Sequence, residues 1–265
     1  MPSNPSPLLL LSGAGMMAVG AAAVLLYRRG RSVSWTVFGL GALAWIISVA
    51  LKFAWALPMN SRVKAALDAM LPATAADPLY WLYIGLLTGV FECGFTLLFV
   101  KRTRLKAADW DAAVAFGIGF GAIEAFLLGL LSFIGLLIVI VFWDQLPEDT
   151  RTTVANRVQG NLLAIPMPVA ERVSALLAHV FTCVLIVYAV RIGESRWFWI
   201  SFAYKSLLDA FAAWGILATN LASSTRTLAA FEAAVGVFAL FGLAGLVFVR
   251  KRYPFPDGIV SPQSP

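Results

Sequence analysis

Charged residues are scarce in this sequence. Only 13% of its 265 residues are Asp, Glu, Lys or Arg, whereas a soluble domain has about a quarter. Hydrophobic residues make up 60% of the chain, and the mean hydropathy is +0.84. A helix in water keeps one polar face, but a helix in lipid is apolar all round. This composition excludes an ordinary soluble enzyme and predicts a membrane protein.

The sequence also lacks the marks of a disulfide-stapled or nucleic-acid-binding protein. Its two cysteines, Cys93 and Cys183, fall inside apolar segments, where we expect free buried thiols rather than a disulfide. The net charge is +6, but the basic residues gather at the ends of apolar segments and form no long basic arm. No Lys or Arg precedes the first apolar segment, so we do not expect a cleavable signal peptide. No nucleic-acid partner is expected.

What the chain does have is a series of long apolar runs. A spanning helix needs about 20 such residues, and seven segments qualify: 7–27, 33–57, 79–100, 112–143, 167–190, 197–218 and 228–249. The sequence therefore predicts an all-α fold, a polytopic membrane bundle of about seven transmembrane helices. We expect one domain over residues 1–250 and a Pro-rich cytoplasmic tail over residues 251–265.

Two connections and one span stand out by their length. The connections 58–78 and 144–166 are the longest, and the second is expected to form a surface loop or a short lid. The fourth span is longer than a bilayer requires, so we expect it to tilt, to project beyond the membrane, or to break near Gly129 or Gly135.

The basic residues indicate an orientation. Twelve Lys and Arg residues lie in connections on one side, near residues 28–31, 101–106, 191–196 and 250–252, and five lie on the other side. Because cytoplasmic loops carry the excess of positive charge, we expect the N-terminus outside and the C-terminus in the cytoplasm. The expected location is the plasma (inner) membrane of a bacterium.

Nine ionisable residues interrupt the apolar segments. They are Lys52, Glu92, Glu124, Glu171, Arg172, His179, Lys205, Asp209 and Glu232. A charge at the bilayer centre costs at least about 2.5–3.5 kcal/mol unless it is paired or hydrated, so these side chains should face the interior of the bundle. Intramembrane charges of this kind are candidates for a functional site.

Depth within the spans narrows the set. Glu92, Glu124, His179 and Asp209 each lie some 12 or 13 residues from a membrane surface, which at 1.5 Å per residue is a depth of roughly 18 Å. Lys205 and Asp209 are four residues apart and share a helix face. Such a group can hold a metal, activate a water molecule, carry protons or form a charge-balanced polar core, and depth alone leaves these alternatives open.

Four sequence blocks carry a resemblance to a known family. They are FECGFTLLFVKR (91–102), DWDAAVAFGIGFGAIEAFLLG (109–129), ERVSALLAHVFTCVLIVYAVR (171–191) and WFWISFAYKSLLDAF (197–211). In this order they resemble the YhfC-type intramembrane proteases, which are related to the CAAX-prenyl-protease/Abi and PrsW-type membrane proteases. The resemblance covers a protease-like core over residues 79–218. The glycine-rich block and the ER…H block are its most specific parts.

The resemblance implies a polytopic protease and assigns roles to four residues. Glu92 matches the first acid of the family, Glu124 the acid of the glycine block, His179 the histidine after ER, and Asp209 the acid of the last block. If the protein is active, these are its catalytic residues. If a metal is retained, Glu124, His179 and Asp209 are its ligands and zinc is the metal.

The chain departs from the family pattern at three positions. Cys93 stands where the family has a second Glu, Phe120 where it has a histidine between glycines, and Lys205 where it has a histidine four residues before the acid. A zinc site needs about three protein ligands, and a neighbouring ammonium repels a divalent cation. We therefore expect Lys205 to replace the charge of a metal, with no cofactor, and to neutralise Glu124 or Asp209.

Three roles follow from these residues. The first is a catalytically inactive family member that acts as a scaffold or assembly subunit. The second is an active intramembrane endopeptidase with an altered Glu/His site, using Glu92 or Glu124 on water. The third is an ion or proton pathway, or a transporter, built from the same charges. The expected partners are the lipid bilayer and either other membrane protein subunits or a transmembrane substrate.

Overall fold

A computed structural model describes residues 4–158, 165–219, 221 and 225–253. Every regular element in these residues is helical. The long helices are α1 (Leu10–Arg28), α2 (Trp35–Met70), α3 (Ala73–Thr88), α5 (Trp110–Val141), α7 (Pro166–Ile192), α8 (Ser195–Ala218) and α9 (Thr225–Arg250). The shorter ones are η1 (Pro7–Leu9), η2 (Gly89–Gly94), α4 (Phe95–Arg102), η3 (Arg104–Ala107), η4 (Trp143–Gln145) and α6 (Glu148–Val158).

Seven helical segments are long and apolar enough to cross a membrane. The third combines α3, η2 and α4 into one continuous helix over Ala73–Arg102. The predicted all-α, polytopic bundle of about seven spans is therefore confirmed, and the chain is an integral membrane protein. Of the three alternatives expected for the fourth span, the break does not occur, because α5 runs without interruption through Gly129 and Gly135.

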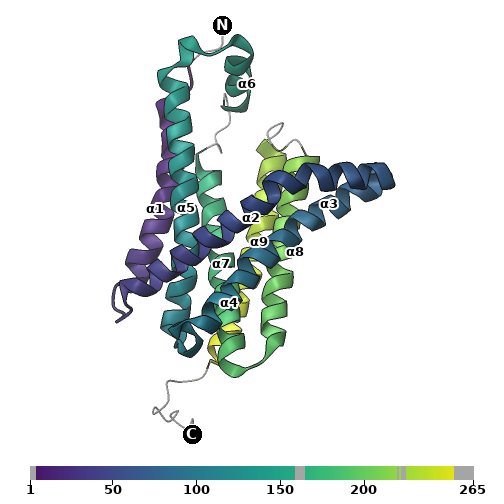
Figure 1. Cartoon of the computed structure of the whole chain (residues 1–265). Helices are drawn as coiled ribbons and strands as arrows, with labels where there is room; N and C mark the ends of the chain where they lie inside the picture. The colour runs from purple at the N-terminus through teal and green to yellow at the C-terminus, as the bar shows by residue number, and fades with distance from the viewer. Residues whose placement is uncertain (1–3, 159–164, 220, 222–224, 254–265) are drawn as a thin grey trace.

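Helices α5 and α7 form the centre of the bundle. Residues 113–122 of α5 and 178–189 of α7 are buried throughout. Figure 1 shows α1 beside α5, with both rising past the other helices toward α6, while α2 and α3 run together diagonally across the front of α7, α8 and α9. The polar groups on α5 and α7 therefore lie where neighbouring helices can cover them.

The predicted connection 58–78 is wrong. Helix α2 continues through Pro58 to Met70, and α3 begins at Ala73. Lys64 holds this end of the hairpin, since its Nζ lies 2.5 Å from Asp68 Oδ1 and 3.1 Å from Asp77 Oδ1. Hydropathy marks where a chain stops being apolar, but a helix with polar side chains can continue past that point.

The other predicted connection, 144–166, contains the helix α6, and residues 159–164 of it lie outside the described part. The predicted tail is described only as far as Tyr253. That side chain is buried and donates its hydroxyl to the carbonyl of Ala108 at 3.0 Å. Burial raises the pKa of the Tyr253 phenol. The chain thus stays packed on the bundle for at least three residues beyond the expected end of the domain at residue 250.

Close contact between helices depends on glycine where backbones meet. A Cβ built on Gly119 of α5 would lie 2.0 Å from the carbonyl oxygen of Phe38, and one on Gly41 of α2 would lie 2.1 Å from that of Phe116. Side chains at these two positions would push α2 away from α5. Small residues at such crossings let two membrane helices approach closely.

Replacing Gly119 by Ala should therefore destabilise the protein. The added methyl group meets rigid backbone of α2, and overpacking of this kind costs about 1–3 kcal/mol. Gly135→Ala is the matched control on the same helix, because a Cβ there meets no atom within 4 Å of the described structure, and Ala gains up to about 1 kcal/mol of helix propensity over Gly. Thermal unfolding in detergent should separate the two variants. Equal transition temperatures would contradict the close α2–α5 crossing.

Candidate functional site

Four spans bring the predicted polar residues together. Glu92 comes from η2, Glu124 from α5, His179 from α7, and Lys205 and Asp209 from α8. Two further cations join them, Lys52 from α2 and Arg172 from α7. We call these seven residues the ionic core.

Glu92 lies in a π-helical turn, the only such turn in the described residues. Turns of this type are rare inside helices and are frequent at functional sites. Gly89 begins the turn, where a Cβ would lie 2.2 Å from the hydroxyl of Ser206 on α8. The close α3–α8 contact therefore places Glu92 next to the polar side chains of α8.

The Glu92 carboxylate is buried between two lysines. Lys52 Nζ donates to Oε1 at 2.6 Å, and Lys205 Nζ lies 3.6 Å from Oε2. Lys52 also reaches the hydroxyl of Thr88 at 3.5 Å. A single buried acid thus has two cations, and the charge cost of placing Glu92 inside the membrane is offset by direct pairing.

His179 lies between the two glutamates. Its Nε2 is 2.7 Å from Glu124 Oε2, and its Nδ1 is 4.0 Å from Glu92 Oε2. Neither ring nitrogen is aligned for a hydrogen bond with a described residue. The imidazole, 1% exposed, therefore lies within 4.0 Å of both glutamates and joins the two halves of the ionic core by its position.

Glu124, the acid of the GFGAIEAFLLG stretch, is held by three groups. Arg172 Nη1 donates to Oε1 at 2.7 Å, the indole N–H of Trp45 donates to Oε2 at 2.8 Å, and His179 approaches the same oxygen. Arg172 also pairs with Glu171. Arg172 therefore pairs with two acids, and it is the cation that neutralises Glu124.

Lys205 was expected to neutralise Glu124 or Asp209. Its Nζ lies 3.3 Å from Asp209 Oδ1, one helical turn away, and its second acidic neighbour is Glu92. No ion pair between Lys205 and Glu124 occurs in the described structure. The pairing with Asp209 is the one that the structure contains.

The other two departures from the family pattern also line this region. The Phe120 ring packs on the His179 ring, with 5.2 Å between their centroids. The thiol of Cys93 is free and buried, 3.9 Å from the carbonyl oxygen of Ser201. The space that these residues enclose with Lys205 has no room for a water molecule.

The donor set does not fit a metal. Among the described residues, no three His, Cys, Asp or Glu side chains are grouped so that they could hold an ion. Glu92, Glu124 and Asp209 each have a Lys or Arg nitrogen within 4 Å, so their oxygens are already paired with positive charge. The ammonium of Lys205 would repel a divalent cation placed between Glu92 and Asp209.

Three partners were not assigned from the sequence. Lys52 and Arg172 were among the nine ionisable residues of the spans but were given no acidic partner in the site, and Trp45 was not singled out. Trp45 carries a signal that could have identified it, because a buried indole N–H usually needs an acceptor. For Lys52 and Arg172 the signal is the unbalanced charge of Glu92 and Glu124 at the same depth.

Seven apolar helices around a buried set of acids, basic residues and one histidine define a polytopic membrane protein with an intramembrane polar site. The family model described as YhfC intramembrane metalloprotease matches residues 15–224. This chain belongs to the YhfC intramembrane metalloprotease family, which confirms the expected family. The match includes the first two spans as well as the expected core 79–218.

A relative supports the same assignment. The "Uncharacterized membrane protein YhfC" of Bacillus subtilis (strain 168) is 29% identical over 203 residues, which are 69% of this chain and 74% of that protein. No solved structure matches this chain.

Proposed function

We propose that this protein is a non-catalytic member of its family that acts as a scaffold or assembly subunit in the membrane. The observation that carries the proposal is the position of Lys205. Its ammonium lies between Glu92 and Asp209. The family resemblance implies a histidine at this position, and the lysine supplies the positive charge that a metal would supply. The same three acids and one histidine then serve as a structural core instead of a hydrolytic site.

The packing of the ionic core supports this role. Peptide hydrolysis needs a water molecule beside an acid or a metal, and the space between Glu92, His179 and Lys205 has no room for one. An ion or proton pathway through the ionic core would also need water, and the space beside His179 has no room for it. A scaffold needs neither.

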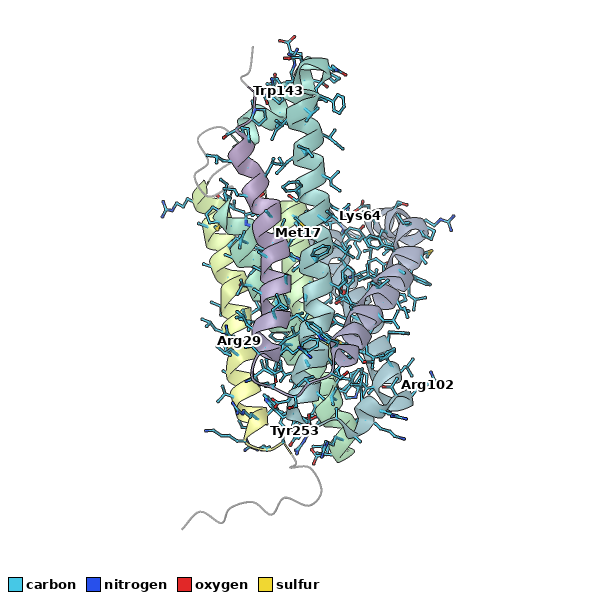
Figure 2. All side chains as sticks on the ribbon, turned by 90° about the vertical axis from the view of Figure 1, so that its left-hand side faces the viewer. Met17, Arg29, Lys64, Arg102, Trp143 and Tyr253 are labelled. Atoms are coloured by element: carbon cyan, nitrogen blue, oxygen red, sulfur yellow. The ribbon has the colours of Figure 1, made fainter. Side chains whose placement is uncertain are left out.

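The basic residues support an orientation and a location. Figure 2 labels Arg29, Arg102 and Tyr253 at one end of the bundle and Trp143 at the other. We place the Arg29 end in the cytoplasm of a bacterium, with the N-terminus outside the inner membrane. The partners of a scaffold of this kind are other membrane protein subunits or a transmembrane segment of a substrate that a catalytic protein then processes.

Metal content tests the proposal. Protein purified without chelators from zinc-supplemented cells should contain far less than one zinc per chain by elemental analysis. The double variant Phe120→His/Lys205→His should bind about one zinc per chain, because it places two new imidazoles beside His179 and removes the ammonium.

The controls separate the possible outcomes. Adding His179→Ala to the double variant should abolish its zinc binding. One zinc per chain in the unmodified protein, lost on His179→Ala, would contradict the scaffold and favour the altered endopeptidase. A folded double variant without zinc would show that Phe120 and Lys205 do not occupy the family's histidine positions.

A further inference from the structure

An apolar groove lies on the surface of the bundle, away from the ionic core. It has a volume of about 500 Å³ and is formed by α1, α2 and α5. Its lining is apolar throughout: Gly20, Ala21, Val24, Leu25, Trp35, Phe38, Gly39, Ala42, Gly119, Ala122, Ile123 and Phe126. Because α2 crosses α5 closely at Gly119 and then leans away, the groove remains open between α1 and α2.

The size of the groove limits what can fill it. A helix with its side chains is about 10–12 Å across, so 500 Å³ corresponds to only about one turn of it. A transmembrane helix of a partner would therefore lie mostly outside the groove. A single acyl chain is much thinner and can follow the groove along α1.

One end of the groove is basic. It ends at Leu25 and Trp35, next to the turn that carries Arg28 and Arg29. The guanidinium of Arg28 lies over the ring of Trp35, with its Cζ 4.3 Å from the ring centroid. Figure 2 shows Arg29 at the same end of α1.

Arg28 and Arg29 have no acidic partner among the described residues, whereas their neighbour Arg31 has one. Arg31 lies 3.5 Å from Asp111 Oδ1 and is already engaged. Arg28 and Arg29 are exposed, so their N–H groups are available to a phosphate.

We propose that this groove binds an anionic phospholipid, with one acyl chain along α1 and the phosphate on Arg28 and Arg29. The apolar wall sets the place of the chain, and the arginines set the preference for a negative headgroup. The site is independent of the ionic core, since none of the seven core residues lines it.

Native mass spectrometry of the whole protein in detergent tests the site with phosphatidylglycerol and, as a neutral probe, phosphatidylcholine. Phosphatidylglycerol should be retained and phosphatidylcholine should not. Arg28→Gln/Arg29→Gln should weaken phosphatidylglycerol binding by roughly fivefold for each arginine, the attraction that one basic residue near an anionic surface provides. The matched control, Arg102→Gln/Arg104→Gln, removes two charges at the same end of the bundle away from the groove.

Filling the groove provides a second, independent variant. A Cβ on Gly39 meets nothing within 4 Å, so Gly39→Leu should fold and should displace the acyl chain while both arginines remain. Excess inorganic phosphate should not compete, because it has no chain to bury. Equal retention of the two lipids would overturn the proposal, as would equal losses in the two arginine variants, unchanged binding in Gly39→Leu, or displacement by phosphate alone.

Discussion

Lys205→Met should lower the free energy of unfolding by about 3–5 kcal/mol, the usual cost of removing one partner of a buried ion pair. Methionine keeps most of the volume of the side chain and removes only the charge. Lys205 is buried, and it is the only cation paired with Asp209 in the described structure. Its loss leaves Asp209 unpaired and Glu92 with Lys52 alone. Reversible unfolding in mixed detergent micelles measures the change.

A second substitution identifies the cause of that loss. Asp209→Asn in the Lys205→Met background should recover part of the stability, because it removes the carboxylate that was left unpaired. Lys64→Met is the matched control, since its pairs with Asp68 and Asp77 are exposed to solvent and should contribute little to stability. Strictly additive effects of the Lys205 and Asp209 substitutions would show that the pair does not stabilise the fold.

The spans of this protein could be predicted from the sequence because lipid imposes a strong rule on each residue. Every side chain facing hydrocarbon must be apolar over about 20 residues, and the seven runs meet that rule without reference to one another. The rule ends at the membrane surface. It therefore could not detect that α2 continues to Met70, where polar side chains such as Lys64 and Asp68 support the helix.

The depth of the site in the membrane could also be predicted from the sequence, but which of its acids pairs with which cation could not. Counting residues from the span ends placed Glu92, Glu124 and His179 at one depth, and the structure brings their side chains together. Pairing depends instead on the rotation of each helix about its axis. The π-helical turn at Glu92 changes that rotation within a span and directs the carboxylate toward Lys52 and Lys205.

Because pairing depends on helix rotation as well as on depth, the cations were harder to place in the site than the acids. A long cation can reach several acids from one backbone position, so depth alone allowed Lys205 to pair with Glu124. In the structure Glu124 pairs with Arg172, which lies seven residues closer to the start of the fifth span than His179, the residue expected at the depth of the site. The site thus extends along α7 from His179 to Arg172, and the ER of the ER…H block belongs to the same ionic core as its histidine.

Arg172→Gln should therefore destabilise the protein about as much as a core substitution, by about 3 kcal/mol, although Arg172 lies near the start of its span. The substitution leaves Glu124 with the Trp45 indole and His179, but without its guanidinium. Glu124→Gln in the same background should restore part of the stability, because an amide oxygen still accepts from Trp45 and carries no charge. Arg172→Lys should retain less stability than the original arginine, since an ammonium lacks the planar fork with which a guanidinium bonds both Glu124 and Glu171.

Arg196→Gln, at an exposed pair with Glu194, is the control and should change the free energy of unfolding by less than about 1 kcal/mol. If Arg172→Gln behaves like Arg196→Gln, Glu124 is not neutralised by Arg172, and the membrane must tolerate its charge by another route.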